Sequence, residues 1–395
     1  MIFGDPAELR AYQNLVGAFE QGHPAIRVEL IHIPSQTDYR QRLALDFAAG
    51  APADVVLLNY RRYADFAAKG MLEPLQPYLA TSTLIQESDF YSEALAPFRW
   101  NRELMCLPQN VSSLVVYYNK DAFDAAGLPY PDADWTRDDF VSMARTLTRD
   151  IDGDGRIDQH GVGIEPSLIR LAPFIWQNRG SLVKPVAMPF ELALDEPPAL
   201  AALQWFVDLR VTHHVTPDAV EEESEDSESR FLNGRVAMFF NSRRGVPTYR
   251  TITVFDWDVA PLPRDHGRRA NVLHADGYCM AALTADKRAA WTFIEFANSP
   301  KGQTIVAASG RTVPSLISVA NSPAFLDPGA QPANSRVFLD AIPTLFAMPV
   351  VPGWGDIEAI ADAEIERAFY GAATITDTAR TAVLRSEEYF NALSR

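Results

Sequence analysis

Residues 107–121 read LPQNVSSLVVYYNKD, and the interpretation of the whole chain depends on this stretch. Residues 114–118 are apolar and rich in Val and Tyr, which is typical of a strand. Polar residues precede this strand at 109–113, and a helix-like pattern follows it after residue 121. Two interpretations are open. The stretch is either one more buried strand of an α/β domain or a strand that crosses between two lobes and exposes its polar residues to a cleft.

The size and charge of the chain exclude several classes of protein. A chain of 395 residues is too long for one ordinary core, so two or more domains are expected. The 35 Lys and Arg against 51 Asp and Glu give a net charge of −16, which argues against nucleic acid or an anionic membrane as the main partner. No window approaches 18 uninterrupted apolar residues, so no transmembrane segment is predicted.

The two cysteines and the start of the chain bear on where the protein works. Cys106 and Cys279 both lie in apolar runs, and two cysteines are too few for a disulfide framework, so we expect buried free thiols. The chain opens MIFGDPAEL without a signal-peptide pattern. This start fits either a cytoplasmic protein or one whose leader has been removed.

Hydrophobic periodicity predicts an α/β chain. Helical spacing over residues 8–20 and 39–49 alternates with predicted strands at residues 26–33 and 54–58, which favours an open, mainly parallel sheet. A helix-rich middle follows, and residues 357–392 are expected to be helical throughout. The acidic run at residues 220–229, VEEESEDSES, is interpreted as a solvated loop.

The most specific local motif is the acidic sequence DIDGDGRID at residues 150–158. Its spacing matches the start of a calcium loop, and position 12, where an EF-hand has a bidentate Glu, is Gly161. A turn rich in Asp and Gly that holds no ion is the alternative. The motif therefore predicts a structural calcium site with these ligands: Asp150, Asp152, Asp154, Arg156 through its carbonyl, and Asp158.

Aromatic residues occur beside polar residues in several predicted loops, namely residues 59–62, 176–180, 240–244 and 352–356. Rings that cover the C–H faces of a sugar, together with Asp, Asn or Arg that bind its hydroxyls, are what a carbohydrate pocket needs. No HExxH, Walker A, GxSxG or CxxC motif occurs, so the sequence contains no catalytic signature and no cofactor is required.

With these features in order, the chain resembles the maltose-binding-protein-like extracellular solute-binding proteins that serve ABC importers. The resemblance covers nearly the whole length and includes GMLEPL at 70–75, FLNGRVAM at 231–238 and ANSPKGQ at 297–303. Other matching stretches occur at residues 3–5, 19–28, 51–56, 107–120, 135–140 and 310–315. Each motif alone is weak, and their order along the chain is what makes the resemblance strong.

The resemblance implies a two-lobed periplasmic-binding-protein fold of type II, with a mainly parallel sheet and flanking helices in each lobe. The expected lobes are residues 1–110 with 270–322, and residues 115–265 with 326–395, joined by crossings near 111–114, 266–270 and 323–325. It further implies a ligand cleft that closes by hinge motion, and docking of the closed form on an ABC permease. A monomer is expected, in the periplasm or outside the cell, with lipid anchoring left open.

Positions can also be carried over from the family one by one. The ligand contacts that the resemblance implies are Asp5, Asp38, Tyr39, Asn59, Tyr60, Arg61, Asn110, Ser112, Glu165, Trp176, Asn178, Asn241, Arg244, Asp276, Gly277, Arg311 and Trp354.

Two of these positions depart from maltose binders, because Ser112 stands where an acid is found and Arg244 where an aromatic platform is found. Both changes, together with other arginines near the expected cleft, give weight to a smaller or anionic ligand such as a sugar acid, sugar phosphate or glycerol phosphodiester. The alternative is that these arginines form salt bridges at the rim. The sequence therefore predicts a carbohydrate-binding protein of an importer and no enzyme, with a two-lobed glycoside- or phosphodiester-cleaving enzyme as the competing interpretation.

Overall fold

The structure is a computed structural model that describes residues 1–185 and 191–393. The chain forms two compact units. Unit 1 comprises Met1–Ser112 and Leu273–Asp327, and unit 2 comprises Ser113–Val272 and Pro328–Arg395. The chain therefore passes from one unit to the other three times, after Ser112, after Val272 and after Asp327.

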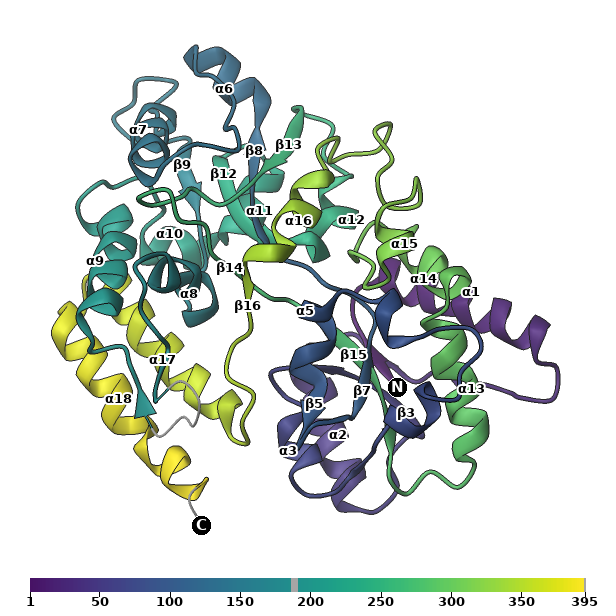
Figure 1. The fold of residues 1–395 in the computed structure, drawn as a ribbon. Coiled ribbons are helices and arrows are strands. Elements are labelled where there is room, and N and C mark those ends of the chain that lie inside the picture. Colours follow the sequence, from purple (N-terminus) through teal and green to yellow (C-terminus); the bar gives the residue numbers. More distant parts are fainter. Residues whose placement is uncertain (186–190, 394–395) are drawn as a thin grey trace. The chain divides into compact units, whose positions relative to one another are not determined.

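The sheet of unit 1 is organised around β15 (Asp276–Ala281), which is antiparallel to β3 (Val55–Asn59), β4 (Leu72–Glu73) and β7 (Cys106–Pro108) (Figure 1). The short strands β1 (Ile2–Phe3) and β2 (His32–Ile33) pair in parallel. The remaining α-helices and strands are α1 (Pro6–Gly22), α2 (Gln36–Ala48), α3 (Ala64–Ala67), α4 (Gln76–Leu79), α5 (Ser92–Leu95), β5 (Arg99–Trp100), β6 (Glu103–Leu104), α13 (Lys287–Ala297), α14 (Pro300–Ala307) and α15 (Ile317–Ala320).

The sheet of unit 2 has the strand order β13-β8-β12-β9 (Figure 1). It consists of β13 (Trp257–Ala260), β8 (Leu114–Asn119), β12 (Val236–Ser242) and β9 (His160–Gly163). The other strands are β10 (Val183–Lys184), β11 (Glu191–Leu192), β14 (Asn271–Val272) and β16 (Leu345–Phe346). The helices are α6 (Lys120–Ala126), α7 (Arg137–Leu147), α8 (Leu168–Gln177), α9 (Pro197–Val211), α10 (Ala219–Ser224), α11 (Ser227–Leu232), α12 (Val246–Tyr249), α16 (Arg336–Asp340), α17 (Trp354–Phe369) and α18 (Ile375–Ala392).

The strand predicted at residues 114–118 is confirmed as β8, and each of its six residues is buried. Its apolar run does not alternate with polar residues, because both faces of β8 are buried. The first helix is confirmed as well. Asp5 caps α1 by accepting hydrogen bonds from the backbone N–H groups of Ala7 and Glu8.

The α/β class is confirmed, but the prediction of mainly parallel sheets is wrong for the described strands. In unit 1, β15 returns from the second crossing and runs against all three of its neighbours. In unit 2, β8 is antiparallel to both β12 and β13, and only β12 and β9 are parallel within that sheet. The βαβ order of the first residues predicts parallel neighbours, whereas strands that arrive from distant parts of the chain set the pairing.

The prediction of free thiols is also wrong, because Cys106 and Cys279 form a disulfide. The two residues are directly opposite each other in the antiparallel pair β7–β15, with their Cα atoms 4.3 Å apart. This separation lies just below the usual Cα–Cα range of disulfides, which is about 4.4–6.8 Å. The partner depends on the register between two strands that are far apart in sequence, and such a register cannot be obtained from local sequence patterns.

Three further differences concern the extent of elements. The acidic run at 220–229 forms α10 and the start of α11, whose N-termini are capped by Asp218 and Asp226. Carboxylates at helix N-termini stabilise the helix, so the charge of this run does not make it a loop. The C-terminal helical region is broken at residues 370–374, where Gly371 has φ +76°. The strand expected over residues 26–33 is limited to β2.

Among the described residues, no helix is long and apolar enough to span a bilayer.

Candidate functional site

The polar stretch before β8 forms the centre of a hydrogen-bonded cluster in unit 1. Gln109 donates its backbone N–H to the Asp276 carbonyl at 2.8 Å, and Asn110 Oδ1 accepts the Asp276 N–H at 2.8 Å. On the other side, the Val111 N–H donates to the carbonyl of Val313 at 2.9 Å. The stretch is thereby held between the start of β15 and the loop at residues 310–315. These contacts bring Asn110, Asp276 and Arg311, all predicted ligand contacts, into one region of the unit.

The ends of β3 and β15 add amide and acidic side chains to this cluster. Asn59 and Asp276 are paired across the two strands, and Asn59 Nδ2 donates to Asp276 Oδ1 at 3.0 Å. Asn59 Oδ1 accepts from the backbone N–H and from Nε of Arg61, both at 3.2 Å. Gly277 follows on β15, and a Cβ at this position would lie 3.0 Å from the ring of Phe98. The side chains at this sheet end are therefore fixed by one another before any ligand arrives.

Arg311 is held by two acidic side chains at the N-terminus of α1. Its Nη1 donates to Asp5 Oδ2 and its Nε lies by Glu8 Oε2, each at 2.7 Å. The side chains of Arg311 and Glu8 are 13% and 6% exposed. Burial raises the pKa of the Glu8 carboxyl to about 8, although the neighbouring guanidinium acts against this shift. The pKa of Arg311 is raised, because its attraction to Glu8 and Asp5 outweighs the burial that lowers it.

Two tyrosines of unit 1 share one hydrogen-bond acceptor. The hydroxyls of Tyr12 and Tyr278 both donate to Gln109 Oε1, the latter at 2.7 Å. Burial raises the pKa of both phenols far above their ordinary value, so both remain protonated donors. Gln109 is 3% exposed, and the two hydrogen bonds to its amide oxygen help to fix the position of the polar stretch.

Several predicted contacts of unit 1 do not present their side chains to this cluster. Tyr39 and Tyr60 are 2% and 0% exposed, and their hydroxyls donate to the backbone carbonyls of Leu57 and Leu273. Asp38 is exposed in the first turn of α2. Ser112 is 3% exposed, pairs with His274 through its backbone, and its Oγ has no hydrogen-bond partner among the described residues. These placements favour a structural role for Tyr39 and Tyr60.

In unit 2, Asn241 at the end of β12 lies in a second polar cluster. Its Oδ1 accepts from Nη2 of Arg170 at 3.3 Å, and its Nδ2 donates to the Tyr249 hydroxyl. Arg170 Nη2 also lies 3.3 Å from Glu165, whose side chain is 68% exposed. The exposed acid and the buried amide, both predicted contacts, are thus bridged by one arginine of α8.

Trp176 and Trp354, two predicted ligand contacts of unit 2, are both buried and do not expose a ring face of their own. Trp176 is 7% exposed and stacks on Phe346 of β16, with ring centroids 5.1 Å apart and an interplanar angle of 21°. Phe346 is itself 41% exposed, so it presents the outer face of this aromatic pair. Trp354 is 0% exposed at the start of α17, and its Nε1 has no hydrogen-bond partner among the described residues.

The arginine pair at the end of β12 divides into one exposed and one buried residue. Arg244 is exposed, whereas Arg243 is 2% exposed, donates to Ser335 Oγ at 2.9 Å and lies over the ring of Phe338. Burial lowers the pKa of Arg243 to about 10. Arg243 therefore lies within the core of unit 2.

Asn178, another predicted contact, caps the end of α8 and accepts a hydrogen bond from Arg137 Nη1 at 3.3 Å.

The acidic loop at residues 150–158 brings three of its four carboxylates together. One carboxylate oxygen from each of Asp150, Asp152 and Asp158 lies within 4.8 Å of the others. Asp154 is outside this group, and its Oδ1 accepts the backbone N–H of Arg156 at 2.8 Å. Oxygen donors at this spacing fit a hard cation such as Ca²⁺.

Three residues of these clusters were missed from the sequence, namely Glu8, Arg170 and Phe346. Glu8 had a usable signal, because it lies three residues after Asp5 and therefore next to it on the first turn of a helix. The other two are brought into place by contacts across the fold. Their neighbours in the sequence do not distinguish them from ordinary core or surface residues.

The sequence matches a family of known proteins. Residues 4–304 match the family model described as bacterial extracellular solute-binding protein, so this chain belongs to that family. The family and the similar structures are binding proteins rather than enzymes.

Individual relatives are distant but cover nearly the whole chain. A putative binding protein of Brucella abortus is 23% identical over 369 residues, which span 91% of this chain and 85% of the relative. The ABC substrate-binding protein of Listeria monocytogenes in complex with cycloalternan has a TM-score of 0.88 at 24% identity, covering 100% of this chain and 97% of that one. UgpB of Mycobacterium tuberculosis in complex with glycerophosphocholine has a TM-score of 0.84 at 22% identity, covering 100% and 98%. At these identities the structural matches establish the two-lobed fold.

Proposed function

We propose that this protein binds a neutral carbohydrate or carbohydrate derivative outside the cytoplasm and delivers it to the permease of an ABC importer. Membership of the solute-binding family supports the class. The similarity to the Listeria protein, whose complex contains cycloalternan, supports a carbohydrate ligand. The closing of two lobes around the ligand, which the sequence resemblance implies, stays a prediction, and so does the contact with a permease.

The observation that carries the proposal is the pairing of Arg311 with Asp5 and Glu8. The sequence left two explanations for the arginines near the expected cleft: an anion-binding group or salt bridges with carboxylates. For Arg311 the second explanation is supported, because two acids lie against one guanidinium. The cluster of unit 1 then consists mainly of carboxylate and amide groups, namely those of Asp5, Asn59, Asn110 and Asp276. The carboxylates accept hydrogen bonds from sugar hydroxyls and repel phosphate or carboxylate ligands, and the amides can both accept and donate hydrogen bonds.

The similarity to UgpB, whose complex contains glycerophosphocholine, supports the alternative of a solute that carries a phosphodiester. Arg244 of unit 2 is exposed, and it is the residue on which such a ligand would depend. The two candidates differ in whether the ligand carries an anionic group, so one titration series separates them.

The experiment is isothermal titration of the purified protein with matched pairs: a sugar and its phosphate, a polyol and its phosphate, and glycerol against a glycerol phosphodiester. We expect binding of at least one neutral member, with its phosphate bound at least tenfold more weakly. Binding confined to the anionic members would contradict the neutral ligand and favour the alternative. Conversion of a bound ligand to products, followed by NMR, would contradict a binding protein and favour an enzyme.

The disulfide supports the location. Disulfides persist in oxidising compartments and are rare in the cytosol, so the Cys106–Cys279 pair is consistent with a protein that works in the periplasm or outside the cell. Fractionation of cells that express the native gene would test this part of the proposal. Recovery of the protein in the cytosolic fraction with reduced thiols would contradict it.

A further inference from the structure

The side chain of Asn271 bonds to the first strand of unit 2 as a backbone peptide group would. Its Nδ2 donates to the Leu114 carbonyl at 2.8 Å, and its Oδ1 accepts the Leu114 N–H at 3.0 Å. The same oxygen accepts the N–H of Val272 at 2.8 Å. Asn271 and Leu114 are 4% and 1% exposed. One buried amide therefore gives hydrogen-bond partners to three backbone groups of buried residues.

A side chain is needed here because the neighbouring strand stops short of Leu114. β13 pairs with β8 only as far as Ala260, which is opposite Val116. The residue after it, Pro261, has no N–H to donate, so the ladder ends there. On the other side of β8, the pairing with β12 continues to Leu114. Asn271 thus takes the place of β13 at the start of β8.

The backbone of Asn271 belongs to a different pair of strands. β14 is parallel to β16, with Asn271 opposite Leu345 and Val272 opposite Phe346 (Figure 1). β14 and β16 form a two-stranded sheet of their own. Because the side chain of Asn271 bonds to β8 while its backbone lies in β14, this residue joins the small sheet to the large one.

Phe346 is the aromatic side chain that β16 exposes, and its ring is stacked on Trp176 of α8. β16 has two residues, so its position depends on β14 rather than on a long ladder of its own. α8 is held separately, because Gln177 Nε2 donates to the Pro263 carbonyl at 3.0 Å. The stack therefore has two supports. Trp176 is held through its own helix, and Phe346 is held through β14 and Asn271.

We propose that Asn271 is a positioning residue for carbohydrate binding, which holds the exposed ring of Phe346 in a fixed place relative to β8. This inference rests on the proposed function, because it assumes that the Phe346–Trp176 stack contacts the sugar. The tie lies beside two crossings of the chain, since Leu114 is the second residue after Ser112 and Asn271 precedes the last residue before the next crossing. A ring that is already ordered loses less entropy when a ligand binds. Loss of the amide should therefore weaken binding without removing a ligand contact.

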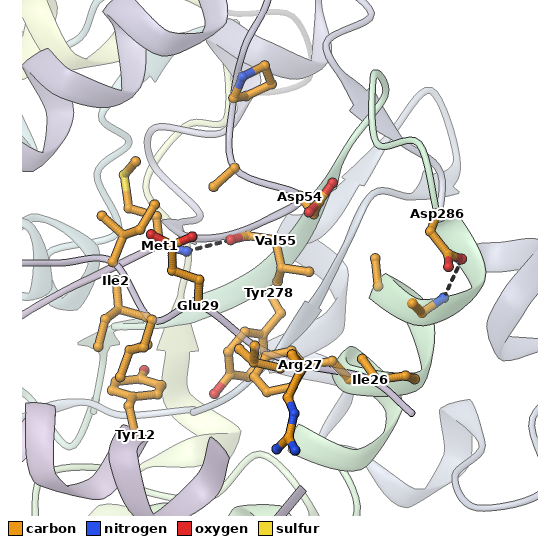
Figure 2. A pocket seen from close by; sticks show the side chains of 18 of the residues that line it. Met1, Ile2, Tyr12, Ile26, Arg27, Glu29, Asp54, Val55, Tyr278 and Asp286 are labelled. Atoms are coloured by element: carbon orange, nitrogen blue, oxygen red, sulfur yellow. Dashed lines mark hydrogen bonds between the residues drawn. The ribbon is translucent and has the colours of Figure 1, made fainter. Parts of the chain in front are cut away.

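The first test needs no ligand. Asn271→Leu has a similar size and removes all three hydrogen bonds. Asp286→Ala is the control, because Asp286 accepts the Ala289 N–H at 2.9 Å at the start of α13, and its loss destabilises unit 1 (Figure 2). We expect the amides of residues 344–348 to exchange about tenfold faster with solvent in Asn271→Leu and to be unchanged in the control. Unchanged exchange in both variants would overturn the proposal.

Asn271→Asp provides a milder change for the same measurements. It keeps the oxygen that accepts from Leu114 and Val272 and loses only the donor to the Leu114 carbonyl. Its effects should have the same direction as those of Asn271→Leu, and it replaces that variant if Asn271→Leu does not fold. Wild-type exchange at residues 344–348 in folded Asn271→Asp would contradict a role for the donated hydrogen bond.

The second test is a double-mutant cycle in calorimetry, with maltose and cellobiose as probes. For a probe that binds, Asn271→Leu should weaken affinity about fivefold in the wild-type background and less than about twofold in Phe346→Ala, because the amide acts through that ring. Equal losses in the two backgrounds would overturn the positioning role. A wild-type protein that binds neither probe would count against the proposed function for these sugars, and the exchange experiment would still decide whether Asn271 anchors β16.

Discussion

Arg311 donates a hydrogen bond from Nη1 to Asp5 Oδ2 at 2.7 Å across 306 residues of sequence. The contact joins the N-terminus of α1 to the loop at residues 310–315, which in turn pairs with the crossing segment through Val111 and Val313. Glu8 holds the same guanidinium from the other side. The position of the polar cluster in unit 1 therefore depends on one buried cation with two acids.

Removal of this cation should destabilise the protein. In Arg311→Gln, the buried Glu8 and the partly exposed Asp5 lose the guanidinium that donates hydrogen bonds to them, and we expect a loss of about 3 kcal/mol in the free energy of unfolding, measured by urea denaturation. Arg27→Gln is the matched control, because the Arg27–Glu20 pair has an arginine side chain that is 78% exposed and should contribute little. Equal losses in the two variants would show that Arg311 is not a structural anchor.

The raised pKa of Glu8 predicts a specific dependence of stability on pH. The folded protein keeps the Glu8 proton up to pH about 8, whereas the model value for an unshifted carboxyl is 4.5. The contribution of this group is therefore complete below pH 4.5 and is lost as the pH rises through about 8. Between pH 5 and 9, the free energy of unfolding should fall more in the wild type than in Glu8→Gln. Parallel pH profiles for the two proteins would contradict the shift.

The disulfide should stabilise the folded state by constraining the unfolded chain. It closes a long loop, with 173 residues of sequence separation, and a loop of this kind contributes on the order of 2–4 kcal/mol. The Cys106→Ser/Cys279→Ser double variant should therefore melt at a lower temperature than the oxidised protein in calorimetry. Reductant should lower Tm of the wild type and leave the double variant unchanged. An effect of reductant on both proteins would indicate another cause.

The exposed face of Phe346 should contribute to carbohydrate binding. Trp176 supports the Phe346 ring from beneath, so the pair offers a rigid aromatic surface to the apolar face of a sugar. With the ligand found by the titration series, Phe346→Ala should weaken affinity about tenfold, which corresponds to ~1.4 kcal/mol. Leu384→Ala is the control, because Leu384 is 57% exposed on α18 and is not a predicted contact. An unchanged dissociation constant for Phe346→Ala would remove this pair from the site.

The acidic loop at residues 150–158 is expected to bind calcium. Addition of CaCl₂ to the protein after treatment with EDTA should raise Tm, by mass action on the folded state, and about 2.7 kcal/mol is expected at 100 times the dissociation constant. Asp150→Asn removes one charge from the three grouped carboxylates and should weaken the response at least tenfold. A Tm that does not respond to calcium in the wild type would leave the loop as a turn held by its own hydrogen bonds.

Sequence reasoning succeeded where local patterns or ordered motifs carry the information. The period of α1, the apolar run of β8 and the motif order were enough to predict the helix, the strand and the family. Contacts that depend on register or on distant residues were not predicted. The Cys106–Cys279 bond requires the pairing of β7 with β15, and the Trp176–Phe346 stack joins α8 to β16. Neither relationship leaves a pattern in the residues that neighbour it in sequence.

In the candidate site, too, some residues were predicted correctly from the sequence and others were not. Asn59, Asn110, Asp276 and Arg311 were expected from the resemblance, and the structure brings them into one cluster of unit 1. Whether they bind a ligand stays a prediction. Tyr39 and Tyr60 were expected on the same grounds, but their hydroxyls bond to backbone carbonyls in the core. A homologous position identifies a place along the chain, whereas the direction of a side chain depends on the packing around it.

The disulfide also fixes the covalent topology of the molecule. Cys106 precedes the first crossing and Cys279 follows the second, so the whole segment Ser113–Val272 of unit 2 lies inside the loop that the bond closes. A single proteolytic cut anywhere within that segment leaves both fragments attached to unit 1. The oxidised protein can therefore be cut once within Ser113–Val272 and remain one molecule, and it then separates into fragments on a denaturing gel only after reduction.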